Sequence, residues 1–246
     1  MKKLITGSRG VAAVDPLFIK SIMIHWDKVP KDSYVRRIRS LKGLECLSFQ
    51  SPVTFFVGEN GSGKSTLLEA MAVSYGFNPE GGTMNYDFST FDSHSELHEA
   101  VTLVKGYRRA KWGYCLRAES FYNVATKALD YSPIDDLHKQ SHGESFMEIM
   151  GGFGMDGLFF LDEPEAALST QRQLALLIEL YRCAKEGSQF FIVTHSPILL
   201  GLPGAQILAF DKGQIRQCEY EETDSYRITK SFVNNREGML KIILED

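Results

Sequence analysis

The feature that most constrains this chain is a glycine-rich segment between an apolar run and a helical pattern. Residues 58 to 65 read G-E-N-G-S-G-K-S and match the phosphate-loop pattern G-x-x-x-x-G-K-[ST] at every fixed position. The apolar run Val53–Val57 precedes the segment, and a helical pattern follows it and stops at Gly76. Strand, glycine loop and helix start are the context that this motif requires. The sequence therefore predicts a nucleoside triphosphate site.

The residue types explain how such a loop would work. Glycines let backbone N–H groups surround a polyphosphate, and the helix start adds a partial positive charge. Lys64 would reach the β- and γ-phosphates, and the Ser65 hydroxyl would bind Mg²⁺. The alternative, a glycine turn that binds nothing, is disfavoured because the motif and both flanks agree. The candidate binding residues are Gly58, Glu59, Asn60, Gly61, Ser62, Gly63, Lys64, Ser65 and Thr66.

Composition limits the other possibilities. The 246 residues are 43% hydrophobic and carry a net charge of −4, which argues against a predominantly basic nucleic-acid binder but leaves room for a local basic groove. The four cysteines are scattered, which suggests free thiols in a reducing cytosol. No apolar run approaches the roughly 20 residues that cross a bilayer. We therefore expect a soluble, cytoplasmic protein.

The segment before the loop predicts antiparallel strands. Phe18–Trp26 has β-type composition, 27–32 is a turn by its proline and aspartates, and Leu41–Phe49 is a second strand interrupted by a glycine. Trp26 or Tyr34 could stack on an adenine base. The alternative for each is an ordinary half-buried aromatic side chain.

Beyond the loop, the pattern predicts a helix over Ser95–Val104 and a strand over Trp112–Leu116. The basic segment Lys105–Lys111 could lie on nucleic-acid phosphates, although such a run is more often a solvated face. Further along, Thr170–Glu186 predicts a helix, and Asn235–Leu244 predicts the last one. The apolar face of the first of these should comprise Leu174, Leu177, Ile178 and Tyr181. Residues 207–218 predict a terminal hairpin.

Two carboxylates follow the buried-strand pattern Leu158–Leu161. Asp162, at the carboxyl end of such a strand, can hold Mg²⁺, usually through water. The adjacent Glu163 is the natural general base for an attacking water. D-E-P after an apolar run is also a common strand end, but its combination with a phosphate loop favours the functional interpretation.

A histidine ends the next buried strand. His195 follows the apolar run Phe190–Val193, and it could hydrogen-bond the γ-phosphate or the attacking water. A histidine satisfied within its own strand end is the alternative. The expected position on a neighbouring parallel strand favours function, so the candidate catalytic residues are Glu163, His195 and Lys64.

Together these segments resemble ABC-type ATPases. G-E-N-G-S-G-K-S-T, L-D-E-P-E-A-A-L-S and V-T-H-S-P are similar to the Walker A, Walker B/D-loop and H-loop motifs, and within that superfamily to the small stand-alone group labelled AAA or SMC/DNA-repair. The resemblance implies a single α/β domain over 1–246. It also implies a mainly parallel central sheet, an antiparallel N-terminal β region and a helical signature subdomain near 78–150.

The same resemblance implies a signature motif L-S-G-G-Q shortly before Walker B. Residues 140–144 read Q-S-H-G-E and match it only at Ser141 and Gly143, with Glu144 in place of the glutamine. S-x-x-E is equally a helix capping box, and a capped helix start is itself an anion site. In the family this motif contacts the γ-phosphate that the opposite subunit binds.

The family's Q-loop glutamine is missing after the strand Trp112–Leu116. L-R-A-E-S stands there, so Glu119 is a candidate for binding Mg²⁺ or positioning water, and Arg117 is a competing candidate. An ordinary surface pair is the alternative.

Three functions remain open. In the first, ATP and Mg²⁺ binding and hydrolysis drive homodimerisation, with Lys64 of one chain and Ser141 of the other holding each ATP. This switch would regulate a protein partner such as a nuclease, or act on DNA, as in repair or defence. The second is the ATPase subunit of an ABC membrane transporter, which the altered signature and missing glutamine disfavour. The third is a non-hydrolysing, nucleotide-gated binding module, against which Glu163 argues.

Overall fold

The central element of the fold is a seven-stranded mixed sheet. The computed structural model describes residues 17–84, 95–117 and 156–244. The strand order is β10-β9-β3-β8-β7-β6-β4, and the inner five strands run parallel. The inner strands are β9 (Gln206–Asp211), β3 (Val53–Val57), β8 (Gln189–Val193), β7 (Gly157–Asp162) and β6 (Trp112–Leu116). The edge strands β10 (Gln214–Gln217) and β4 (Gly82–Thr83) are antiparallel to their neighbours.

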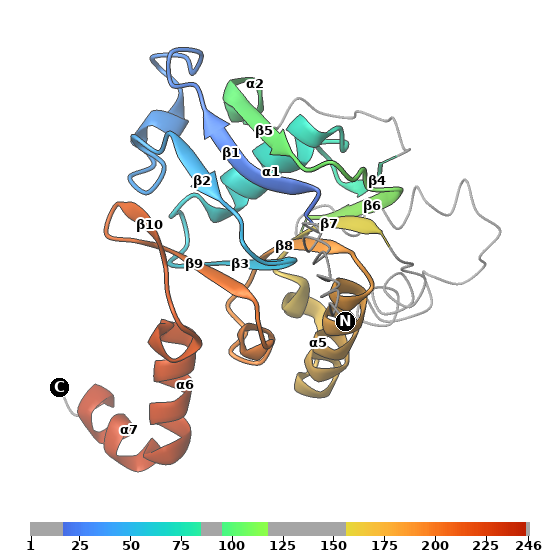
Figure 1. The fold of residues 1–246 in the computed structure, drawn as a ribbon. Coiled ribbons are helices and arrows are strands. Elements are labelled where there is room, and N and C mark those ends of the chain that lie inside the picture. Colours follow the sequence, from blue (N-terminus) through green and yellow to red (C-terminus); the bar gives the residue numbers. More distant parts are fainter. Residues whose placement is uncertain (1–16, 85–94, 118–155, 245–246) are drawn as a thin grey trace, which may run out of the picture.

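The sheet is buried on both faces, as the continuous apolar runs of its strands predict. Successive residues of β3, β7 and β8 alternate between two hydrophobic clusters because side chains of a strand point to opposite faces. Phe56, Phe160 and Phe191 face one cluster, and their neighbours face the other. Helix α1 (Lys64–Tyr75) packs on the first face and α5 (Thr170–Lys185) on the second (Figure 1).

A second, three-stranded antiparallel sheet lies beyond α1, so that the helix is held between the two sheets (Figure 1). Its order is β2 (Cys46–Ser48), β1 (Ile19–Ile24) and β5 (Val101–Lys105). A buried glutamine joins the two sheets. The Gln189 side chain accepts from the N–H groups of Phe18 and Ile19 at 2.8 and 2.9 Å and donates to the Ile19 carbonyl at 2.9 Å.

The predicted strands at β1, β3, β6, β7 and β8 and the hairpin β9–β10 are confirmed, with small differences at their ends. Two other predictions are wrong. The segment Leu41–Phe49 is a strand only over its last part, because 39–43 form turns that bury Leu41. The predicted helix Ser95–Val104 is a single turn, α2 (Leu97–Ala100), followed by β5. Pairing of β5 with β1, about 80 residues away in sequence, overrides the local helical pattern.

The predicted packing face of α5 is also wrong. Leu174, Ile178 and Tyr181 are exposed, and only Leu177 of that set packs against the core. The buried face comprises Leu176, Leu180 and Cys183. Apolar residues occur around most of this helix, so spacing alone could not distinguish the two faces.

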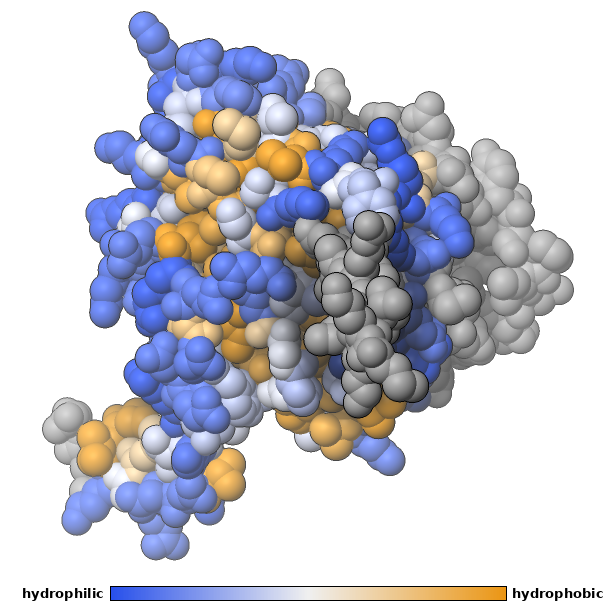
Figure 2. Space-filling model, in the orientation of Figure 1, coloured by the Kyte–Doolittle hydropathy of each residue, from blue (hydrophilic) through white to orange (hydrophobic). Residues whose placement is uncertain are grey.

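The C-terminus holds two helices. The predicted last helix is confirmed as α7 (Arg236–Leu244), but α6 (Asp224–Asn234) was not predicted. The two helices extend from the β9–β10 end of the sheet, away from the body of the molecule (Figure 1). Hydrophobic side chains gather on them (Figure 2), and neither helix buries a residue. The exposed apolar residues are Ile228, Phe232, Val233, Ile242, Ile243 and Leu244.

Short 3₁₀ turns complete the described chain: η1 (Tyr34–Arg37), η2 (Pro164–Ala167), η3 (Leu199–Gly201) and η4 (Tyr220–Glu222). All four cysteines are free, and three of them are buried. Within the described ranges, no helix has the length and apolarity to cross a membrane. Most of the predicted signature subdomain, including 118–150, lies outside the described residues. That boundary stays a prediction.

Candidate nucleotide site

The glycine loop joins the carboxyl end of β3 to the start of α1. Gly58, Gly61 and Gly63 all have positive φ (139°, 76° and 96°), the region that glycine adopts readily. At Gly58 a Cβ would lie 2.5 Å from the Phe210 carbonyl oxygen, so β9 and the loop can approach only through a glycine. The sequence pattern thus corresponds to a real backbone requirement.

Lys64 begins α1 and turns back over the loop. Its Nζ donates to the carbonyl oxygens of Gly58 and Glu59, both at 2.8 Å. Burial lowers the pKa of this ammonium, and the nearby carboxylates Glu163 and Asp162 oppose that change. A buried cation held over a glycine loop is suited to an anionic ligand.

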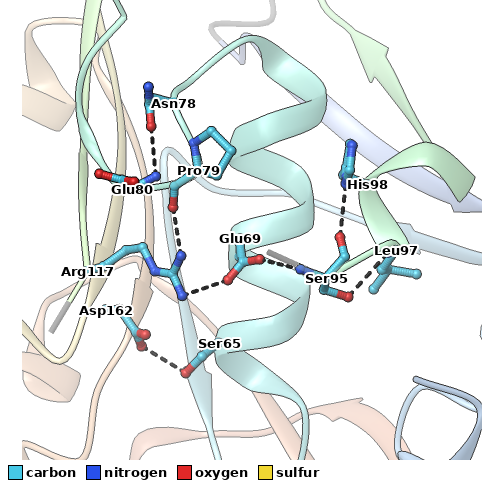
Figure 3. A network of polar contacts seen from close by, with 10 residues as sticks. All are labelled: Ser65, Glu69, Asn78, Pro79, Glu80, Ser95, Leu97, His98, Arg117 and Asp162. Atoms are coloured by element: carbon cyan, nitrogen blue, oxygen red, sulfur yellow. Dashed lines mark hydrogen bonds and ion pairs between the residues drawn. The ribbon is translucent and has the colours of Figure 1, made fainter. Parts of the chain in front are cut away.

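The first strand-end carboxylate meets the start of α1. The Ser65 hydroxyl donates to Asp162 Oδ1 at 3.0 Å, across 97 residues of sequence (Figure 3). Burial raises the Asp162 pKa to about 6, and Glu163 adds to the rise. The Ser65 hydrogen bond and the cations Arg117 and Lys64 act in the opposite direction. A cation bound here would favour the ionised carboxylate.

The second carboxylate faces the histidine. Glu163 Oε1 lies 3.8 Å from His195 Nε2, and both side chains are about 40% exposed. Glu163 has φ 49°, an unusual conformation for a residue other than glycine, and its N–H donates to the Val193 carbonyl at 2.9 Å. The turn therefore aims the carboxylate at the end of the neighbouring strand. Lys64, Ser65, Asp162, Glu163 and His195 all lie at this edge of the sheet, where the sequence placed them.

The position expected of the missing glutamine is occupied by an internal ion pair. Arg117 follows β6 directly, and its guanidinium pairs with Glu69 of α1 at 2.9 Å and donates to the Pro79 carbonyl at 2.7 Å (Figure 3). Glu69 also accepts from the Ser95 N–H at 2.8 Å. The side chains of the pair are 20% and 13% exposed. Arg117 therefore links α1 to the segment before residue 85, and Glu69 links α1 to the segment that begins at Ser95.

A cavity of about 380 Å³ extends from Tyr34 and Asn60 to Lys64, Ser65 and Glu163. Tyr34, 48% exposed, also lines a neighbouring cavity of about 670 Å³ with Arg37 and Arg39. Of the two aromatic candidates for base stacking, Tyr34 thus lies beside the loop. Trp26 instead donates its indole N–H to the Leu44 carbonyl at 2.9 Å and packs against the core.

Several basic side chains have roles within the fold. Arg36 donates to the carbonyls of Pro30, Trp26 and Val29. In the basic segment, Arg108 and Lys111 both pair with Asp156, and Lys105 lies over the Tyr75 ring at 4.4 Å. These contacts account for much of the basic character without a nucleic acid.

Four predicted site residues, Glu119, Ser141, Gly143 and Glu144, lie outside the described residues. Sequence reasoning also missed one residue that the structure places in the site. Glu165 accepts a hydrogen bond from the His195 N–H at 2.6 Å. The signal was a second glutamate two positions after Glu163, in D-E-P-E.

The donor set fits Mg²⁺. Ser65 and Asp162 supply a hydroxyl and a carboxylate oxygen, the hard ligands that this ion prefers. No cluster of three or more His, Cys, Asp or Glu side chains suited to a metal occurs in the part of the chain that the structure describes. Proteins commonly hold Mg²⁺ by one or two side chains together with water and substrate phosphates.

Family models match two parts of the chain. A model described as "AAA domain" matches residues 34–124, and one described as "AAA domain, putative AbiEii toxin, Type IV TA system" matches residues 138–201. The first match contains the glycine loop, and the second contains both carboxylates and His195.

The curated relatives that this chain matches are named as ATP-binding proteins. Arabinose import ATP-binding protein AraG of Pseudomonas savastanoi pv. phaseolicola is 29% identical over 185 residues, covering 63% of this chain and 36% of the relative. Ribose import ATP-binding protein RbsA of Corynebacterium glutamicum is 28% identical over 209 residues, covering 74% and 39%. The chain thus spans a little over a third of the length of these relatives.

A solved structure, "An inward-facing conformation of a putative metal-chelate type ABC transporter", is 17% identical with a TM-score of 0.38, over 72% of this chain and 75% of that one. The family models and the curated relatives show AAA-type ATPase regions in this chain and ABC ATPases among its homologues, which indicates that the domain hydrolyses ATP.

Proposed function

We propose that this chain is an ATP-dependent dimer switch: it binds Mg-ATP at the glycine loop, pairs with a second copy, and separates after hydrolysis. The observation that carries the hydrolytic part is the meeting of Ser65 with Asp162 at 3.0 Å, with Glu163 next in the chain and His195 beside it. Asp162 and Ser65 would hold Mg²⁺, which neutralises phosphate charge when bound. Glu163 would take the proton of the attacking water, and His195 would orient that water or the γ-phosphate.

The exposure of the candidate catalytic side chains supports a second copy. Glu163 and His195 are 40% and 42% exposed. Hydrolysis of a phosphoanhydride works best where bulk water is excluded and the charged groups are preorganised. A surface from another molecule would complete this edge. The proposed contribution of that surface is Ser141 with Gly143 and Glu144, where the sequence predicts a helix start with a capping box.

Light scattering tests the dimer. Glu163→Gln should still bind ATP and Mg²⁺ but should not hydrolyse ATP. Its molar mass should therefore double with ATP and stay at the monomer value with ADP. The matched control is Lys64→Ala combined with Glu163→Gln, which should stay monomeric with either nucleotide. A single-mutant protein that is saturated with ATP and still monomeric would contradict the switch.

The output of the switch is a protein partner, such as a nuclease, or DNA. A DNA contact would use the residues around Arg37 and Arg39, which line the cavity beside the loop. If DNA is the output, duplex or single-stranded DNA should raise the ATPase rate, and the effect should fall steeply with salt. A rate that DNA leaves unchanged at low salt would favour a protein partner.

The names of the curated relatives favour a second candidate, the ATPase subunit of an importer. The missing glutamine argues against it, because in the family that region couples to the membrane partner. Arg117, which stands in the same stretch of this chain, instead pairs with Glu69. Fractionation of cells making the tagged full chain separates the two. An importer subunit should sediment with membranes and a cytoplasmic switch should not.

A further inference from the structure

Three consecutive residues at the end of β8 are each held by a side chain from a different element. The His195 N–H donates to Glu165 of η2 at 2.6 Å. The Ser196 hydroxyl donates to Gln173 of α5 at 2.6 Å, and the Pro197 carbonyl accepts from the Tyr220 hydroxyl of η4 at 2.9 Å. The loop is thus fixed from three sides, and only the contact at His195 comes from a charged group.

Glu165 also belongs to the turn that carries Glu163. The Glu163 N–H donates to the Val193 carbonyl at 2.9 Å, and two residues later the Glu165 carboxylate holds the His195 N–H. The turn is therefore joined to the end of β8 on both sides of the Glu163–His195 pair. A charged acceptor makes a stronger bond to a backbone N–H than a neutral one does. Glu165 Oε2 is buried and has no hydrogen-bond partner among the residues that the structure describes.

We propose that Glu165 is a positioning residue for ATP hydrolysis: it holds His195 at the distance from Glu163 that the reaction needs. The proposal rests on the hydrolytic part of the proposed function. The bond to the His195 N–H fixes the backbone at the residue whose ring lies 3.8 Å from Glu163. Displacement of such a ring by about 1 Å can lower a rate by about a hundredfold.

If Glu165 had only a structural role, its loss would unfold the loop that carries His195. The fold of the loop has supports of its own, because the Ser196 hydroxyl accepts from the N–H groups of Ile198 and Leu199 at 3.2 Å, and the Ser196 N–H donates to Thr194 Oγ1 at 3.0 Å. Gln173 and Tyr220 hold the two residues after His195. Loss of the Glu165 carboxylate should therefore leave the loop folded and release the histidine.

Two variants measure the effect. Glu165→Ala removes the acceptor and should lower kcat about tenfold or more while leaving ATP affinity within twofold, since the glycine loop is untouched. Glu165→Gln keeps an oxygen acceptor and should recover most of kcat. Gln173→Ala, which frees the next residue in the loop, is the matched control and should lower kcat less than Glu165→Ala.

A double-mutant cycle with His195→Ala separates positioning from other roles. That substitution keeps the backbone N–H but removes the ring, so Glu165→Ala should have little further effect on kcat in its presence. An undiminished loss in the His195→Ala background would overturn the proposal, as would an unchanged kcat for Glu165→Ala. If Glu165→Ala does not fold, Glu165→Met, which keeps much of the side-chain volume but has no oxygen acceptor, replaces it in the cycle, and equal kcat losses for Glu165→Met with and without the ring would overturn the proposal.

The result also distinguishes this proposal from the function on which it rests. A wild-type protein that releases no phosphate from Mg-ATP contradicts the hydrolytic function itself. A wild-type protein that hydrolyses ATP, with Glu165 and His195 losses that simply add, contradicts only the positioning role. Coupled losses support both.

Discussion

The glycine loop and the His195 loop follow adjacent parallel strands, β3 and β8, but are held in different ways. The glycine loop is shaped by its glycines with positive φ and by Lys64, which donates to a carbonyl of the same loop. The hydroxyl of Ser40, from outside the loop, donates to the Ser62 carbonyl. The His195 loop is held by Glu165, Gln173 and Tyr220, which lie 30, 23 and 23 residues from their partners. Local constraints are visible in a sequence, and distant ones are not.

The largest expected effect concerns the local loop. Lys64→Ala removes the buried ammonium over Gly58 and Glu59, and a charged hydrogen bond of about 3 kcal/mol corresponds to roughly a hundredfold in affinity. Isothermal titration with a non-hydrolysable ATP analogue measures it. Gln173→Ala, which removes a support of the other loop, should leave affinity unchanged. Equal losses for the two variants would erase the distinction between the loops.

A glycine substitution tests the backbone requirement. Gly58→Ala should destabilise the fold by about 3 kcal/mol, because φ is 139° and the new Cβ would meet the Phe210 carbonyl oxygen at 2.5 Å. Gly204→Ala is the control. It also has positive φ (77°), but its Cβ would meet no atom within 4 Å, so it should cost only about 1 kcal/mol. Urea denaturation measures the free energy of unfolding of both variants. Equal losses for the two would show that the glycine loop does not pack tightly against β9.

Asp162, at the end of β7, should make the protein less stable as the pH rises, the opposite of what an ion-paired aspartate does. Its folded-state pKa of about 6 exceeds the ordinary value of 3.8, so the stability that this group contributes is present in acid and lost as pH rises through about 6. Asp162→Asn should therefore stabilise the metal-free protein by about 2 kcal/mol at pH 7 and little at pH 4. Asp27→Asn, at an exposed turn, is the control. A gain for Asp162→Asn that does not grow between pH 4 and 6 would contradict the burial of this carboxyl.

The smallest effect concerns the distant supports. Tyr220→Phe removes only the hydroxyl that donates to the Pro197 carbonyl, and it should cost about 1 kcal/mol in the free energy of unfolding. Because Glu165 still holds His195, kcat should stay within about twofold. A large loss of kcat would mean that the three supports act as one unit, and the account of the His195 loop would need to change.

The sequence predicted the parts of the fold that are set locally. Val53–Val57, the helix that ends at Gly76, and the buried strands before Asp162 and His195 were predicted because apolar runs and glycines decide them. The helix predicted over Ser95–Val104 was wrong because β5 exists only through its pairing with β1. The packed face of α5 was misassigned because its apolar residues offer two faces, and tertiary contacts select Leu176 and Leu180.

The candidate site divides in the same way. The carboxylate, lysine and serine side chains were named from motif spacing, and the structure brings them to one edge of the sheet. Glu165 and the Arg117–Glu69 pair were not predicted as contacts, because their partners are 30 and 48 residues away in sequence. No local pattern shows which backbone N–H or which carboxylate such a side chain will meet.

The most direct test of the central claim is steady-state phosphate release from Mg-ATP by the wild-type chain and by Glu163→Gln, with ATP binding measured in parallel. If Glu163 removes the proton from the attacking water beside Asp162 and His195, the substitution should lower kcat about a thousandfold and leave ATP affinity nearly unchanged. A Glu163→Gln protein that hydrolyses ATP at the wild-type rate would contradict the assignment of this edge of the sheet as the hydrolytic site.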